Sequence, residues 1–401
     1  MSTFTDRTSR LPFSRAAIVR LVSDLLAAEL GRSRGRSSAM LGRSGWDAST
    51  SLDEAGLDLD SLERLDASAA LNEFFHLHEY GAEDHLLTLP RLGDWCDLVA
   101  ESLSKGGTHL TFRTSGSTGA AKRCTHPIAD LAAEMEGWVD ILGPIRRIVS
   151  LVPSHHIYGT LFTAMLPDHL GVELLRAHDN VALLRRAGPG TLVVATPTMW
   201  SHVARTCPTF PTGMTGISST APMPPALAGQ LAAQGLDRLV EIYGASEIGG
   251  IGFRTAPGDP FVLLDRWRRL SDDAVVRDGA DGPVRQELMD RSAWIDARRF
   301  HLNGRLDGAV QVGGTNVFPS LVRETLLAHA GVADAAVRIE PVSGRLKAFI
   351  IPKPDVSGDT LLGQVDGWCG QRLRDVERPR RFTLGHELPR DPMGKLADWP
   401  V

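Results

Sequence analysis

The chain has 401 residues, of which 43% are hydrophobic and 23% are charged, and its formal net charge is −5. This length allows two to three domains, and this charge provides no field that would attract nucleic acid or anionic lipid. The N-terminus has no apolar signal region, and no apolar run is long enough to span a bilayer. We therefore expect a cytoplasmic protein without a nucleic-acid or membrane partner.

The cysteines lie far apart, at Cys96, Cys124, Cys207 and Cys369. No CxxC pair and no Cys/His ligand spacing is present, so the cysteines indicate neither a disulfide framework nor a zinc site. We expect them to be reduced thiols.

The first hundred residues predict a small helical unit, which we place at residues 1–105. Apolar residues recur at helical spacing over three stretches, residues 13–31, 58–75 and 88–103. At the start of the second stretch, Asp60 or Ser61 can serve as the N-cap.

Beyond residue 105, strand-like runs alternate with helical stretches. The expected strands are 109–113, 147–152, 192–195, 215–219 and 239–243, and the expected helices are 128–142, 161–170, 197–205 and 224–234. This alternation predicts an α/β core over residues 106–304, with ligand-binding loops at the strand ends. Residues 305–401 predict a small α+β lid with a helix, a hairpin, a second helix and a terminal loop.

The stretch from Thr114 to Lys122, with the sequence TSGSTGAAK, is rich in glycines and hydroxyl side chains. Backbone N–H groups beside flexible glycines can surround an anion, and the lysine adds a positive charge for the outer phosphates. The spacing is GxxGxxK rather than the GxxxxGK[ST] of a P-loop. The alternative for this stretch alone is a generic surface turn.

Three later segments follow this loop in order: EIYGASEIGG at 241–250, GRLDGAVQVGGTNVFP at 304–319 and ELPRDPMGKLADWP at 387–400. Together with the loop they resemble the adenylate-forming superfamily of acyl- and aryl-CoA ligases and adenylation domains, from about Leu110 to the C-terminus. The resemblance implies a large α/β core with an α+β lid. It also implies activation of a carboxylic acid with ATP and Mg²⁺ to acyl-AMP and pyrophosphate, followed by transfer to a thiol.

The resemblance assigns roles within the expected core. The matched phosphate loop comprises Thr114, Ser115, Gly116, Ser117, Thr118, Gly119 and Lys122. Tyr243 and Gly244 match the segment near the adenine, and Ser246 matches a threonine that contacts phosphate. Glu247 matches the glutamate that helps to bind Mg²⁺, for which the hydroxyl of Thr118 is a further candidate ligand.

The resemblance also assigns roles to the C-terminal part. Arg305 matches the arginine that contacts the ribose, Asp307 the hinge of the lid, and Gly314 the glycine turn of the thiol step. Lys395 matches the lysine that bridges the substrate carboxylate and the α-phosphate. We therefore expect Lys395, Glu247 and a histidine of the acid pocket to be the catalytic residues.

The acid pocket is expected to involve the segments LVPSHHIYG and ISSTAPMP. His156 is the better match to the family's pocket histidine, with His155 as the second choice and a histidine without a role as the alternative. Trp200, Ser219 and Thr220 complete the candidate pocket and suit a small aromatic acid such as a hydroxybenzoate.

The chain departs from the family pattern in several places. The threonine–glycine–aspartate segment that clamps the ribose is missing, and Asp296 is the only nearby candidate for its aspartate. Gln311 replaces a common lysine, and Glu324 lies near the position of a displaced acid. A second hypothesis is therefore a degenerate adenylate-binding scaffold without turnover, and a third is a kinase or P-loop NTPase, which the spacing disfavours.

The segment from residue 13 to 104 is similar to acyl carrier proteins. Asp60, Ser61 and Leu62 match the Asp-Ser-Leu at which a phosphopantetheine arm attaches to Ser61, although the same residues also suit a simple helix cap. The thiol acceptor is therefore expected to be this unit, a separate carrier protein, or coenzyme A.

Overall fold

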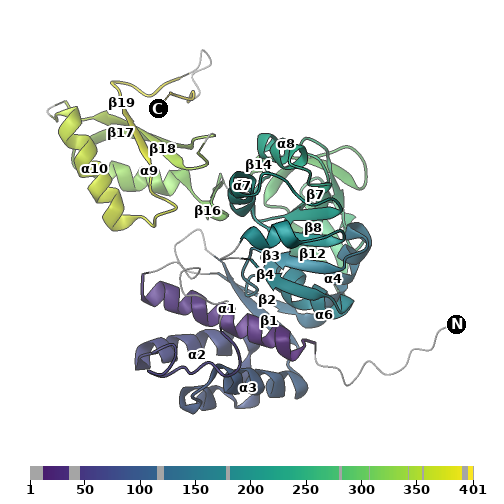
Figure 1. Ribbon diagram of the computed structural model, residues 1–401. Coiled ribbons are helices and arrows are strands. Elements are labelled where there is room, and N and C mark those ends of the chain that lie inside the picture. Colours follow the sequence, from purple (N-terminus) through teal and green to yellow (C-terminus); the bar gives the residue numbers. More distant parts are fainter. Residues whose placement is uncertain are drawn as a thin grey trace. The chain divides into compact units, whose positions relative to one another are not determined.

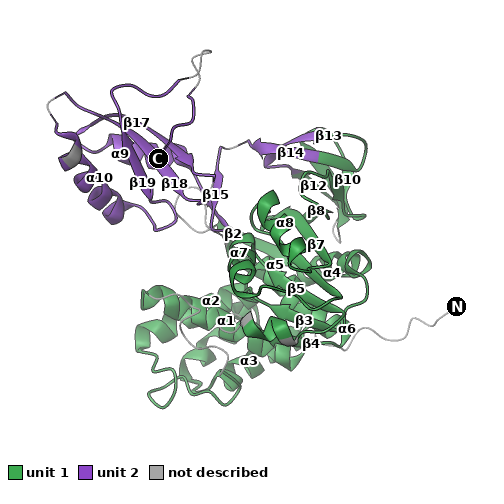
Figure 2. Cartoon of the chain, turned by 45° about the horizontal axis from the view of Figure 1, so that its top comes forward, with its two compact units in different colours: residues 1–114, 121–286, 294–300 green, residues 115–120, 287–293, 301–401 purple. Residues whose placement is uncertain are grey.

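The computed structural model describes residues 12–35, 46–114, 122–177, 181–279, 282–306, 308–341, 343–354, 356–390 and 396–400. These residues form two compact units (Figure 2). The described part of unit 1 lies within 12–114, 122–286 and 294–300, and that of unit 2 within 287–293 and 301–400. No helix within these described ranges is long and apolar enough to cross a membrane.

Unit 1 begins with the predicted helices. They are α1 (Arg15–Ser33), α2 (Ser61–Phe75) and α3 (Leu92–Ser104), with the short 3₁₀ helices η3 (Leu77–Tyr80) and η4 (Glu83–Thr88) between the last two. Ser14 caps α1, and Asp60 caps α2 in a capping box with Glu63. Asp60, rather than Ser61, is therefore the N-cap.

The helical segment packs directly on the α/β part of unit 1 (Figure 1). Helix α1 contacts α2, α3 and the π-helical segment η5 (Thr160–Met165), which explains why most of its residues are buried. Helix α2 contacts strand β1 (His109–Thr114). The expected boundary at residue 105 thus has no counterpart in the two compact units, because these contacts join the helices to the core.

A mixed sheet has the strand order β13-β14-β9-β8-β7-β6-β5-β3-β4; its strands from β9 to β4 lie in unit 1, and most of β13 and β14 is assigned to unit 2. Its parallel part comprises β3 (Arg147–Ser150), β4 (Glu173–Arg176), β5 (Thr191–Ala195), β6 (Met214–Ser218) and β7 (Arg238–Ala245). Its antiparallel part comprises β8 (Gly249–Arg254), β9 (Phe261–Leu263), β13 (Asp290–Trp294) and β14 (Arg299–Arg305). Two smaller sheets are formed by β1 with β2 (Lys122–Pro127), and by β10 (Arg268–Arg269), β11 (Ala274–Gly279) and β12 (Gly282–Glu287).

Helices connect the parallel strands, as the alternation in the sequence predicts. They are α4 (Ile128–Leu142), α5 (Ile157–Gly159), α6 (Leu166–Leu170), η6 (Val181–Arg186), α7 (Pro197–Thr206) and α8 (Pro225–Ala233). A hydrophobic core lies between β5, β6 and helices α7 and α8, and the fully buried Trp200 is part of it. The indole N–H of Trp200 donates to the carbonyl of Ile217 at 3.1 Å.

Unit 2 contains a small sheet with the order β17-β18-β19, flanked by two helices. Its elements are β15 (Val310–Val312), β16 (Thr315–Val317), α9 (Pro319–Leu327), β17 (Val332–Ile339), β18 (Leu346–Pro352), α10 (Gly358–Arg372) and β19 (Arg381–Leu384). The predicted fold class, an α/β core with a helical N-terminal segment and an α+β C-terminal part, is confirmed.

Candidate functional site

Strands β1 and β2 form the hairpin that carries the expected phosphate loop. Thr114 and Lys122 face each other in its last register pair. Ser115, Gly116, Ser117, Thr118 and Gly119 lie outside the described residues, so only the two ends of the expected loop are placed. The amino group of Lys122 lies 3.0 Å from Oε1 of Glu247 in the connection between β7 and β8. The structure thus brings the expected phosphate lysine and the expected metal-binding glutamate together.

A second contact links β2 to the β7–β8 turn. Nε2 of His126 lies 2.7 Å from the carbonyl oxygen of Ser246, so this nitrogen carries the proton and donates. Burial lowers the pKa of His126, and this favours its neutral form. The turn that carries Ser246 and Glu247 is therefore fixed to the phosphate-loop hairpin by both backbone and side-chain contacts.

Glu134 of α4 also binds this turn, and this role of Glu134 was not predicted from the sequence. Its Oε1 accepts the N–H of Gly250 at 2.7 Å, and it occupies the space that side chains at Gly249 and Gly250 would need. Burial raises the pKa of Glu134, although Arg266 lies 3.5 Å from its carboxylate. The sequence feature that could have indicated this role is an acidic residue on the apolar face of a predicted helix.

Tyr243 and Gly244, the residues expected near the adenine, lie at the end of β7. The ring of Tyr243 packs against Phe261 and Phe300, with centroids 5.7 and 5.8 Å away. A side chain at Gly244 would collide with the backbone of Gly249, which explains the glycine at this bulge in the ladder. The aromatic cluster gives this end of β7 a rigid apolar support.

A cavity of about 400 Å³ opens beside the loop between β3 and α5, which carries His155 and His156. Its walls come from α1, α2, β1 and this loop, and they include Leu25, Glu29, Phe74 and Arg113. His156 lines this cavity and is exposed. Desolvation by nearby protein atoms lowers the pKa of His156, which favours the neutral imidazole.

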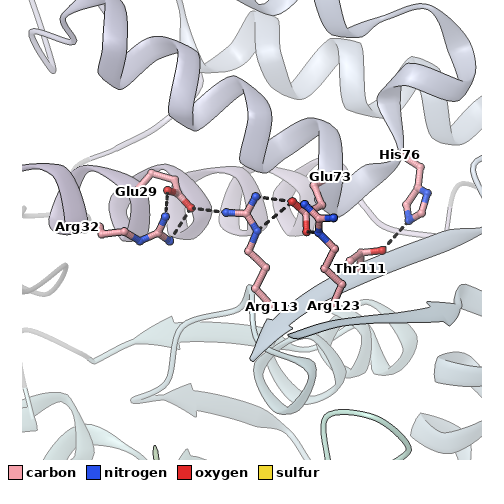
Figure 3. Close-up of polar contacts among 7 residues, drawn as sticks. All are labelled: Glu29, Arg32, Glu73, His76, Thr111, Arg113 and Arg123. Atoms are coloured by element: carbon pink, nitrogen blue, oxygen red, sulfur yellow. Dashed lines mark hydrogen bonds and ion pairs between the residues drawn. The ribbon is translucent and has the colours of Figure 1, made fainter. Parts of the chain in front are cut away.

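A network of ion pairs forms the charged wall of the cavity (Figure 3). Arg113 of β1 contacts Glu29 of α1 at 3.8 Å and also pairs with Glu73 of α2. Arg32 pairs with Glu29, and Arg123 of β2 reaches Glu73 at 2.6 Å. The bond from Arg113 is the main cause of the lowered pKa of Glu73. The network fixes both strands of the hairpin to the N-terminal helices.

Asp24 of α1 holds the histidine loop itself. This fully buried carboxylate accepts the backbone N–H of Ser154 at 2.6 Å and pairs with Arg176 of β4. The N-terminal helical segment thus positions the loop that carries His155 and His156. This role could not be predicted from the sequence, because the partners are 130 and 152 positions away.

The other residues of the expected acid pocket lie elsewhere in unit 1. Trp200 is buried in the core, and the Ser219 hydroxyl donates to the carbonyl of Ile242 at 3.3 Å. Thr220 is exposed and has a φ of 78°, a left-handed conformation that is unusual for a β-branched residue. Among the described residues that line the cavity, His156 and His155 are the members of the predicted set.

Asp296, the candidate ribose clamp, lies in the turn between β13 and β14. Its carboxylate accepts the backbone N–H groups of Arg298 and Arg299, both at 2.8 Å, and pairs with the Arg299 side chain at 2.7 Å. These bonds lower the pKa of Asp296 to about 2. The structure therefore shows Asp296 as an ionised group that stabilises its own turn.

The C-terminal candidates belong to unit 2. Arg305 ends β14, and Gly314 has a φ of 83° in the tight turn between β15 and β16, where glycine is favoured. Asp307 and Lys395 lie outside the described residues. Arg390 and Leu396, which flank the segment containing Lys395, form an antiparallel β-bridge. Gln311 bonds to Asn316 across the hairpin, and Glu324 lies in α9.

Ser61, the candidate attachment residue, is the exposed first residue of α2. The neighbouring Leu62 is 71% exposed and Leu65 is 50% exposed, so apolar surface adjoins the serine. The capping box explains the geometry of this helix start without any modification of Ser61. Attachment of a phosphopantetheine arm to Ser61 stays a prediction.

The fold and the ordered site segments define an adenylate-forming enzyme. The family model described as "AMP-binding enzyme" matches residues 98–271, and the model described as "AMP-binding enzyme C-terminal domain" matches residues 322–395. The chain belongs to this AMP-binding enzyme family and is an AMP-forming acid–thiol ligase.

Relatives align over nearly the whole chain. A 4-coumarate–CoA ligase of Halorhodospira halophila is 40% identical over 94% of this chain and 98% of its own length. A 4-coumarate–CoA ligase of Rhodobacter capsulatus is 39% identical over 95% of this chain and 99% of its own length. The amide bond synthetase from Marinactinospora thermotolerans has a similar fold, with a TM-score of 0.59, 16% identity, and coverage of 94% of this chain and 92% of that one. Most of the N-terminal helical segment therefore lies within the length that the two ligases share with this chain.

Proposed function

We propose that the protein activates an aromatic carboxylic acid of the hydroxycinnamate or hydroxybenzoate class with ATP and transfers it to the thiol of coenzyme A. The ion pair between Lys122 and Glu247 is the observation that carries the proposal, because it joins the end of the phosphate loop to the turn with the metal-binding carboxylate. The names of the two relatives favour 4-coumarate and coenzyme A as the substrates to test first.

In the first half-reaction, the positive charge of Lys122 and the negative charge of Glu247 would have separate roles. A carboxylate oxygen of the acid attacks the α-phosphorus of ATP, the bond to the β-phosphate oxygen breaks, and pyrophosphate leaves. Lys122 would bind the outer phosphates, and the hard carboxylate oxygens of Glu247 fit Mg²⁺. Bound Mg²⁺ would neutralise negative charge on the phosphates. Lys395 would bridge the acid and the α-phosphate.

The second half-reaction transfers the acyl group. The thiol sulfur attacks the acyl carbon, the bond to the AMP oxygen breaks, and the thiol proton is lost to solvent or a base. We propose that the acid lies against His156, whose neutral ring would contact the reacting carboxylate without a competing charge. The apolar walls beside it, Leu25 and Phe74, suit an aromatic ring.

A pyrophosphate-exchange assay over a panel of acids tests the first step. We expect exchange that depends on 4-coumarate or 4-hydroxybenzoate and weak exchange with an aliphatic acid of similar size. A complete lack of acid-dependent exchange would support the alternative of a degenerate adenylate-binding scaffold. Release of γ-phosphate without any acid would instead indicate a kinase or NTPase.

The acceptor is tested separately with coenzyme A and with phosphopantetheine-bearing carrier proteins. We expect the acyl-CoA thioester to form. Treatment of the chain with a phosphopantetheinyl transferase, followed by intact-mass measurement, tests the carrier in cis. One added arm that is lost in Ser61→Ala would identify the N-terminal segment as an acceptor, and an unchanged mass would leave it a structural support of the core.

A further inference from the structure

Three metal-binding side chains meet where α2 ends and η3 begins. His76, His78 and Glu79 each offer one ligand atom, and these atoms lie within 4.8 Å of one another. None of the three has a role in the proposed reaction. We propose that they bind one divalent transition-metal ion such as Zn²⁺, and that the fold prepares both imidazole rings for it.

The His76 ring is held by a strand of the core. Its Nε2 lies 2.8 Å from the hydroxyl of Thr111 in β1 (Figure 3). The Thr111 hydroxyl in turn lies 2.7 Å from the hydroxyl of Thr125 in β2. Nδ1 faces the carboxylate of Glu79 at 3.1 Å. A metal ion between Nδ1 and this carboxylate would replace the proton there, while Nε2–H donates to Thr111. An outer hydrogen bond of this kind orients a metal-bound histidine.

The His78 ring is held in the complementary way. The Asn72 side-chain oxygen accepts the backbone N–H of His78 at 2.8 Å and lies 3.0 Å from its Nδ1. Because the backbone N–H can only donate, the Asn72 atom in both contacts is the amide oxygen. Nδ1 of His78 therefore carries the proton, and Nε2 is left as the ligand atom.

The ligand set and its position suit a small transition metal. Two imidazoles and one carboxylate are ligands that Zn²⁺ accepts, and a fourth position is left for water. In a tetrahedral site with metal–nitrogen bonds of about 2.0–2.1 Å, neighbouring ligand atoms are about 3.3 Å apart. His78 and Glu79 are exposed, so their side chains have room to move the remaining distance.

The backbone conformation at His76 determines how the chain enters η3. His76 has a φ of 56°, a left-handed conformation that non-glycine residues rarely adopt, and this places the turn of η3 directly after α2. The sequence predicted no zinc site because the CxxC and Cys/His spacings that indicate one are missing. The pattern HxHE at residues 76–79 is not among those spacings. Because Thr111 belongs to β1, a metal on His76 would also strengthen the contact between the helical segment and the hairpin.

The test is calorimetric titration of tag-free, EDTA-treated, full-length protein with ZnCl₂. We expect one Zn²⁺ per chain, and we expect His78→Ala to weaken binding by at least about 100-fold. Thr111→Val should weaken it about 10–100-fold, because only the outer hydrogen bond is lost, while Thr111→Ser should bind as the original protein does. Zn²⁺ should also raise the melting temperature of the original protein but not that of His78→Ala.

His202→Ala is the matched control, because it removes an exposed histidine far from this cluster in the sequence. It should bind Zn²⁺ with unchanged affinity. Lack of saturable binding to the original protein would overturn the proposal, as would equal affinity in His78→Ala. Equal affinity in Thr111→Val and Thr111→Ser would overturn the claim that the fold prepares the site.

Discussion

The amino group of Lys122 lies 3.0 Å from the carboxylate of Glu247, although the two residues are 125 positions apart in the chain. Both side chains are partly exposed, at 59% and 35%, so this ion pair contributes only about 0–1 kcal/mol to stability. Its importance is positional. It holds the end of the proposed phosphate loop beside the carboxylate that would receive Mg²⁺.

Replacement of Lys122 by Met should therefore lower activity without lowering stability. We expect the pyrophosphate-exchange rate to fall about 10²–10³-fold, because one electrostatic contact to the departing phosphates is lost. The melting temperature should stay within about 1–2 °C. Lys105→Met is the matched control, since Lys105 forms a similarly exposed pair with Glu101 in α3. Equal exchange rates in both variants would contradict the assigned role of Lys122.

Glu134 should make stability depend on pH in a defined direction. Burial raises its pKa above the unfolded value of about 4.3, so the folded state binds this proton more tightly. Its stabilising contribution is then fully present below that unfolded value and is lost as the pH rises through the folded pKa. The carboxamide of Glu134→Gln does not titrate and still accepts the N–H of Gly250.

The melting temperature of the original protein minus that of Glu134→Gln should therefore decrease as the pH rises from 4 to 8. Glu136→Gln, an exposed glutamate on the same helix, serves as the control and should not produce this trend. A difference that instead favours the original protein more strongly at high pH would show that the attraction of Arg266 outweighs burial.

The helices and most parallel strands of the fold follow from local patterns, whereas some antiparallel strands do not. Helix α4 begins and ends at the predicted residues, because Ile128, Leu131, Met135 and Trp138 recur on one face. Strand β8 was missed because it starts with Gly249 and Gly250, which give no hydrophobic pattern. Their lack of side chains reflects the carboxylate of Glu134, a partner that only the folded chain reveals.

The site shows the same division. The sequence motifs identified Lys122 and Glu247 as candidate functional residues, and the structure shows that their side chains form an ion pair. Trp200 was expected to line the acid pocket, but in the structure it is buried in the core beside β5 and β6. The contribution of α1 to the histidine loop depends on Asp24, a charged residue on a buried face, whose partners come from distant segments.

Removal of the charge of Asp24 should strongly destabilise unit 1. In Asp24→Asn the amide oxygen can still accept the N–H of Ser154, but Arg176 loses its counter-charge. Because the carboxylate is fully buried, we expect a loss of about 3–5 kcal/mol in the free energy of unfolding, measured with urea. The double variant Asp24→Asn with Arg176→Met should recover part of this loss, since no unpaired charge is left. A double variant less stable than the single one would refute this explanation.

We expect the backbone conformation at Thr220 to lower the stability of the folded protein. Its φ of 78° costs a β-branched residue about 1–3 kcal/mol, while glycine adopts this conformation freely but loses about 0.5–1 kcal/mol in chain entropy. Thr220→Gly should therefore raise the free energy of unfolding by about 1 kcal/mol, measured with urea. Thr220→Ala keeps a side chain at positive φ and should gain less than the glycine variant. If Thr220 contacts the acid, as expected from the sequence, Thr220→Gly will also raise the KM for the acid while the KM for ATP stays the same. Equal stability of the glycine and alanine variants would show that the backbone at this turn is not strained.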